Sequence, residues 1–187
     1  MHLAALLAPR SFRLPLTAAV AVALAAPLGS AAFAADGSAL DLPPLHVVLP
    51  AGYTFDTHEQ PVTGTGPNDE RVTVTVTTRP AAAPSDPAQL SAEESARQFA
   101  DGPMSGIASR GDRKVLRPLA RFPTQDGKAA YSVVSEWSTG MFSKSHLVQY
   151  LFASADTVVY FSFEGPGAAD PVVKQLDAAL QNQRWDQ

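Results

Sequence analysis

Three potential metal ligands lie within four positions of the chain, namely Asp56, His58 and Glu59. Residues two apart on a strand project from the same face, so Asp56 and His58 could bind one ion. A closed site needs a further ligand, which His46 or His146 could supply only through a tertiary contact. Because such clusters are more often solvated polar loops, we expect no bound metal and no cofactor. A metal-dependent enzyme built on these three residues and His146 is kept as an alternative.

A serine nucleophile needs a neighbouring base, usually a histidine. Ser143, Ser145 and His146 are close in sequence. However, a serine and a histidine that are adjacent on a strand point to opposite faces. The chain also lacks the Gly-x-Ser-x-Gly nucleophile elbow. We therefore predict no catalytic residue, and a small exported hydrolase using His146 is the alternative.

The densest charge feature is a basic run that is opposed locally only by Asp112. On a regular strand, Arg113, Arg117 and Arg121 share one face, with apolar residues between them. Such spaced guanidinium groups suit a protein partner with an acidic surface, or an anionic ligand. The structural alternative is a charged edge strand that discourages sheet-to-sheet aggregation. The full run is Arg110, Arg113, Lys114, Arg117 and Arg121.

Residues 1–34 have the pattern of a secretory signal peptide. Arg10 and Arg13 precede an apolar run, and residues 32–34 fit the small-x-small rule for cleavage. After cleavage near Ala34, the mature chain is expected in the periplasm or outside the cell. Because the sequence contains no cysteine, neither a disulfide nor a lipidated cysteine at the cleavage site can form.

The net charge limits the classes of partner that the mature chain can bind. The leader removes two of the 14 Lys and Arg residues, so 12 basic residues face 18 Asp and Glu, a formal charge of −6. Binding to nucleic acid, or non-specific binding to anionic membranes, requires a positive field. No later apolar run approaches the roughly 20 residues that span a bilayer. We expect no nucleic-acid partner and no membrane anchor after cleavage.

Segments rich in glycine, proline and small residues separate the expected elements in the rest of the chain. Residues 35–44 are small, acidic and proline-ended, which indicates a flexible lead-in. Residues 60–69 contain two glycines and two prolines and are predicted to be a loop. Residues 80–88 are rich in proline and alanine, which indicates a linker. A single globular domain is expected over residues 45–187.

Hydrophobic periodicity predicts an α+β fold. Ser91 and Glu94 form a capping box at the start of one helix, and Asp170 with Pro171 opens another. Short turns between the later strands favour an antiparallel meander. The expected architecture is one layered domain with a mostly antiparallel sheet of about six strands, flanked by two main helices. The main strand-like segments are 46–49, 71–78, 114–122, 129–137, 145–152 and 157–163.

The element order resembles the Mog1/PsbP-like fold, which periplasmic proteins of the DcrB type share. The resemblance rests on that order, on the segment Pro50, Gly52, Tyr53 and Phe55, and on the closing pair 184–185. It implies a binding, assembly or chaperone role without catalysis. We therefore predict an exported, non-enzymatic binding protein of the bacterial periplasm with an assembly, chaperone or immunity-type role. A small-ligand carrier, with an aromatic-lined cavity of several hundred Å³ between sheet and helices, is a further alternative.

Overall fold

The computed structural model describes residues 37–78, 91–154 and 156–186. The predicted signal peptide, residues 1–34, and the predicted linker, residues 80–88, lie outside the described residues. Within the described ranges, no helix is both long and apolar enough to cross a membrane.

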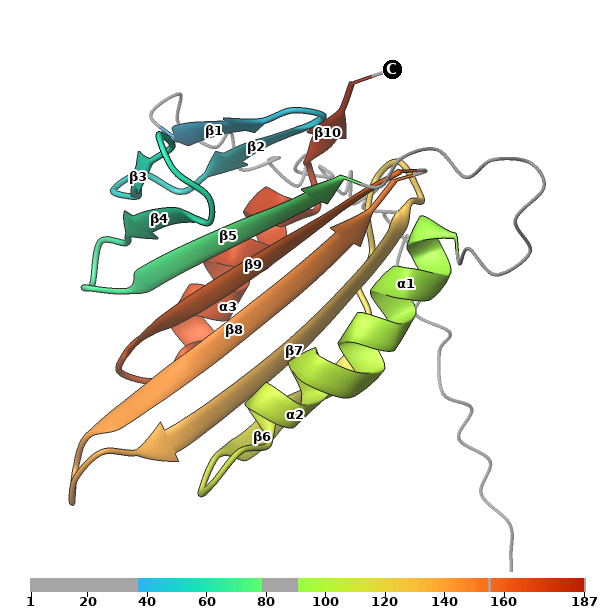
Figure 1. Ribbon diagram of the computed structural model, residues 1–187. Helices are drawn as coiled ribbons and strands as arrows, with labels where there is room; N and C mark the ends of the chain where they lie inside the picture. The colour runs from blue at the N-terminus through green and yellow to red at the C-terminus, as the bar shows by residue number, and fades with distance from the viewer. Residues whose placement is uncertain (1–36, 79–90, 155, 187) are drawn as a thin grey trace, which may run out of the picture. The chain divides into compact units, whose positions relative to one another are not determined.

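A seven-stranded antiparallel sheet is the main element (Figure 1). Its strands are β3 (Thr54–Asp56), β4 (Val62–Thr65), β5 (Arg71–Thr78), β6 (Lys114–Arg121), β7 (Ala129–Ser138), β8 (Lys144–Ala153) and β9 (Thr157–Pro166). Neighbouring strands follow the order β3-β4-β5-β9-β8-β7-β6, so the predicted meander is confirmed. The strands β8 and β9 are apolar on both faces and lie inside the sheet, where both faces can be covered.

One face of the sheet carries most of the aromatic side chains, and α3 (Ala169–Leu180) packs on it. Tyr150, Phe152, Phe161 and Phe163 are all buried on this face. Phe152 and Phe161 meet edge to face, with their ring centroids 5.8 Å apart, which is a favoured arrangement of aromatic pairs. Because each buried ring stabilises the fold by about 1.5–3 kcal/mol, this face holds the main core.

The opposite face is covered by α1 (Ala92–Phe99), the π-helix η1 (Ala100–Met104) and α2 (Ser105–Ala108) (Figure 1). The predicted capping box is present, because the Ser91 hydroxyl accepts from the Glu94 N–H and Glu94 accepts from the Ser91 N–H. The sequence predicts that Gly102 and Pro103 end this helix, with residues 104–108 as an alternative further turn. The alternative agrees with α2, and the chain reaches it through a π turn in which the Ser105 N–H bonds to the Ala100 carbonyl. A helix with π spacing can include Pro103 even though proline has no N–H to donate.

A second, three-stranded sheet consists of β1 (Ser38–Leu42), β2 (Leu45–Leu49) and β10 (Arg184–Trp185). The central strand β2 pairs antiparallel with both neighbours. Leu40 and Leu42 on β1 are buried in the main core. The expectation of a flexible lead-in over residues 35–44 is therefore wrong for residues 38–42, because alternating leucines hold this segment in the core.

The strand β4 lies within residues 60–69, which the sequence predicts to be a loop. A Cβ added at Gly64 would lie 2.4 Å from the Thr54 carbonyl oxygen on β3. The two strands can pair at this point because Gly64 has no side chain. The glycine therefore serves a strand rather than a turn.

Candidate interaction surface

The hairpin between β7 and β8 ends in two large apolar side chains that face solvent. Met141 is 89 % exposed and Phe142 is 95 % exposed. Their loop begins after the last strand pair, Ser138 with Lys144, and is closed by a 3.0 Å hydrogen bond from the Thr139 N–H to the Ser143 carbonyl. The backbone of this loop is thus held by the hairpin, while neither apolar side chain contributes to the core.

Further exposed apolar side chains lie at the same end of the sheet. Ile107 is at the end of α2, and Val115 and Leu116 are at the start of β6; they are 39 %, 38 % and 40 % exposed. Figure 1 shows that α2, the start of β6 and the β7–β8 turn gather at one end of the sheet. We call this set the tip surface: Ile107, Val115, Leu116, Met141 and Phe142.

Arg113 lies beside the tip surface and joins three elements. Its guanidinium stacks over the Trp137 ring of β7 at 4.4 Å, donates to the Ile107 carbonyl at 3.0 Å, and approaches Glu164 of β9 at 3.9 Å. A cation over the face of a tryptophan ring is attracted by the ring's quadrupole. Arg113 therefore fixes the end of α2 against the sheet.

Arg117 lies on the opposite face of the sheet, under α3. Its two terminal guanidinium nitrogens, Nη1 and Nη2, donate to Asp177 at 3.0 Å and 2.6 Å, and the Tyr150 hydroxyl donates to the same carboxylate at 2.6 Å. The hydrogen bonds to Asp177 raise the pKa of Arg117. Burial first, and then the bond to Asp177, raise the pKa of Tyr150. Arg117 is therefore used inside the fold, where it connects β6 to α3.

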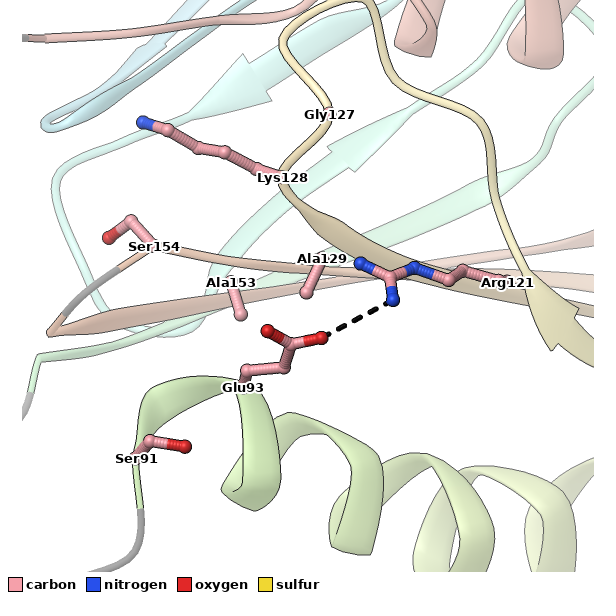
Figure 2. A pocket seen from close by; sticks show the side chains of 8 residues that line it. All are labelled: Ser91, Glu93, Arg121, Gly127, Lys128, Ala129, Ala153 and Ser154. Carbon is pink, nitrogen blue, oxygen red and sulfur yellow. Dashed lines mark ion pairs between the residues drawn. The ribbon is translucent and has the colours of Figure 1, made fainter.

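Arg121 lies beside a small pocket of about 320 Å³ at the other end of β6. It pairs with Glu93 of α1 at 3.4 Å, and both side chains are more than half exposed. Figure 2 shows the Glu93 carboxylate and the Arg121 guanidinium pointing toward each other between α1 and the sheet. Because Glu93 already pairs with this guanidinium, Arg121 does not present a free positive charge to the pocket.

The prediction that Arg113, Arg117 and Arg121 share one face is wrong. The pairing of β6 with β7 shifts register twice, between Val115 and Arg117 and again between Arg117 and Ala120. Each shift changes which face the following side chain occupies. Consequently Arg117 contacts α3, whereas Arg121 contacts α1 and Arg113 contacts α2. The alternative interpretation of this run, a charged edge strand, agrees with the place of β6 at the end of the strand order.

The candidate metal ligands are not brought together with a further histidine. The Asp56 carboxylate accepts a 3.0 Å hydrogen bond from the His58 backbone N–H, and both residues are exposed along with Glu59. His146 is buried on β8 and contacts the Gly167 carbonyl at 3.2 Å. Among the residues that the structure describes, no three His, Asp or Glu side chains could hold one ion. The arrangement that a metal-dependent enzyme would need is thus not supported.

His46 joins the three strands of the small sheet. Its imidazole contacts Asp41 of β1 at 2.8 Å and Asp186, just after β10, at 2.6 Å. The hydrogen bond to Asp41, and then that to Asp186, raise the pKa of His46. These three residues line an open groove of about 1210 Å³, between the small sheet and α3.

The space between α3 and the large sheet is instead filled by aromatic rings, so the cavity expected of a small-ligand carrier is not found there.

The tip surface was not predicted from the sequence. The turn is identified by Ser138, Thr139 and Gly140. The next two residues, Met141 and Phe142, have large apolar side chains although they stand among turn formers. Turns are normally polar because they are exposed to water. The presence of Met141 and Phe142 in a predicted turn could therefore have indicated this surface. Apolar residues in a hairpin loop are stabilised neither by burial nor by turn geometry.

No protein-family model and no curated protein matches this sequence. The chain is similar to the solution structure of cyanobacterial PsbP from Synechocystis, with 16 % identity, a TM-score of 0.49, and coverage of 86 % of this chain and 100 % of that one. It is similar to the Ran-binding protein Mog1p of Saccharomyces cerevisiae, with 13 % identity, a TM-score of 0.41, and coverage of 77 % and 85 %. It is also similar to LpqN of Mycobacterium tuberculosis, which is involved in cell envelope biogenesis, with 11 % identity, a TM-score of 0.43, and coverage of 79 % and 83 %. The predicted α+β class, with a mostly antiparallel sheet, is confirmed by the chain's own sheets and helices.

Proposed function

We propose that the chain is an exported, non-enzymatic binding protein of the bacterial periplasm that works by contact through the tip surface. The observation that carries the proposal is the exposure of two adjacent large apolar residues, Met141 and Phe142, at the end of a regular hairpin. Contiguous apolar residues on a soluble protein mark interaction sites more often than chance exposure does. Assembly, chaperone and immunity-type roles all depend on such contact.

The energetics support binding at this place. Complete burial of a Phe or Met side chain is worth about 1.5–3 kcal/mol. Met141 and Phe142 gain almost none of this in the free protein, since they are 89 % and 95 % exposed. A partner that covers both side chains recovers that free energy without any change in the core. The export part of the proposal rests on the leader pattern in residues 1–34.

Of the three arginines predicted to bind a partner, Arg113 is the one that borders the tip surface. Its guanidinium is held in place by Trp137 and by the Ile107 carbonyl, and 18 % of its side chain is exposed. A pre-oriented guanidinium loses little conformational entropy when it meets a polar group of the partner. In this proposal, Arg113 provides a polar contact at the border of an apolar one.

The proposal predicts that Met141→Ser/Phe142→Ser reduces retention of the mature chain on washed envelopes of its host at least tenfold. Both side chains are outside the core, so the melting temperature of the variant should stay within about 2 °C of the parent. The matched control is Val48→Ser, which removes a 62 % exposed apolar residue from the small sheet and should leave retention unchanged. Equal retention of the two variants contradicts the proposal.

A further inference from the structure

We infer that the tip surface inserts into the interfacial region of a lipid bilayer, so that the domain rests on a membrane by its hairpin end. This inference rests on the proposed function and names the partner of the same surface. Two features of the structure lead to it: the position of the apolar side chains at the end of a protruding hairpin, and the paired charges near this end of the sheet.

The two most exposed residues of the tip surface project from the end of the sheet and do not line a hollow. Met141 and Phe142 lie beyond the last strand pair of the hairpin. Neither the groove beside α3 nor the pocket beside Arg121 includes a residue of the tip surface. A protein partner would have to supply a pocket for these side chains, whereas the apolar layer of a bilayer accepts them without any matching shape.

The charges that are paired near this end of the sheet are of both signs. The Arg113 guanidinium lies 3.9 Å from the Glu164 carboxylate. Lys144 pairs with Glu136 at 2.5 Å, and its hydrogen bond lowers the pKa of that carboxyl. Headgroups such as phosphatidylcholine and phosphatidylethanolamine also carry both signs, so these two ion pairs are compatible with a zwitterionic surface, and no unpaired field of one sign is needed.

Trp137 is the next-to-last residue of β7, just before the hairpin loop, and the Arg113 guanidinium is stacked on its ring. Tryptophan is enriched at the depth of the headgroups, where one side of the ring is apolar and the other is wet. The chain as a whole has a formal charge of −6 after removal of the leader, which does not favour an anionic membrane. The apolar residues must therefore drive binding, and anionic lipid should not strengthen it.

The test uses the mature chain and vesicles of pure phosphatidylcholine in a flotation assay. We expect the chain to float with the vesicles, and Met141→Ser/Phe142→Ser to reduce the partition coefficient roughly 10- to 100-fold, since two buried side chains are lost. Val48→Ser should float like the parent. Replacing a third of the lipid with phosphatidylglycerol, or raising the salt to 0.5 M, should change binding less than threefold.

A second readout locates the contact. In a Trp185→Phe background, the emission of Trp137 should shift to the blue with vesicles and be quenched by lipids brominated near the headgroup. A chain that does not float, or that floats equally well with both apolar residues replaced, overturns the bilayer inference. If envelope retention depends on Met141 and Phe142 but is lost when the envelopes are first treated with protease, the partner is a protein. In that case the proposed function stands and the bilayer inference fails.

Discussion

Asp177→Ala is expected to lower the free energy of unfolding by about 3 kcal/mol. The carboxylate of Asp177 accepts two hydrogen bonds from Arg117 and one from Tyr150, and the Tyr150 side chain is fully buried. Its removal leaves a partly buried guanidinium and a buried hydroxyl without their acceptor. For a domain of this size, the melting temperature should fall by about 6–10 °C, measured by circular dichroism.

Arg121→Ala provides the matched control for this prediction. Arg121 also forms one ion pair from β6 to a helix, but the side chains of Arg121 and Glu93 are 58 % and 57 % exposed. Exposed pairs of this kind contribute between zero and about 1 kcal/mol. If Asp177→Ala costs no more than Arg121→Ala, the contact between β6 and α3 does not stabilise the fold as described.

Phe161→Ala should be among the most destabilising single changes, at about 3–5 kcal/mol in a urea titration. Phe161 has no exposed surface. Its ring lies between those of Phe152, at 5.8 Å, and Phe163, at 6.1 Å. Alanine leaves a cavity that strands on both sides hold open, because their backbones are fixed by hydrogen bonds to their neighbours.

Phe142→Ala removes the same side chain from the tip surface. Because Phe142 is 95 % exposed, its removal should change the free energy of unfolding by no more than about 0.5 kcal/mol. The contrast separates residues that hold the fold together from residues that are free to bind. A loss of 2 kcal/mol or more at Phe142 would show that the hairpin end packs against the rest of the chain.

Local patterns in the sequence were enough to predict the larger elements. Each of these patterns involves residues that are close in sequence. They are the alternation of residues 71–78, the capping box of Ser91 with Glu94, and the apolar residues on both faces of β8 and β9. By contrast, β1 and β4 are short strands that lie in segments rich in turn formers, and β10 pairs with a strand that is far away in the chain. Because turn formers indicate irregular structure, residues 35–44 were predicted to be a lead-in and residues 60–69 a loop.

The candidate site was harder to predict, because its features depend on register and exposure. The three arginines have the spacing of one strand face, and only the two register shifts in β6 reveal that Arg117 faces α3. Nothing in the sequence around Pro118 fixes where those shifts occur, although a proline cannot donate to the ladder. The exposure of Met141 and Phe142 likewise follows from the absence of any packed element beyond the hairpin among the described residues.

Photocrosslinking from the tip surface tests the central claim most directly. A benzophenone amino acid is placed at position 142 in one variant and at position 48 in another, and each is expressed in the host and irradiated. If the domain works through its hairpin end, position 142 should crosslink to lipid, or to a discrete partner protein, and position 48 should give no adduct. Adducts from position 48 alone, or none from position 142, would contradict the assignment of the tip surface as the place where this protein makes contact.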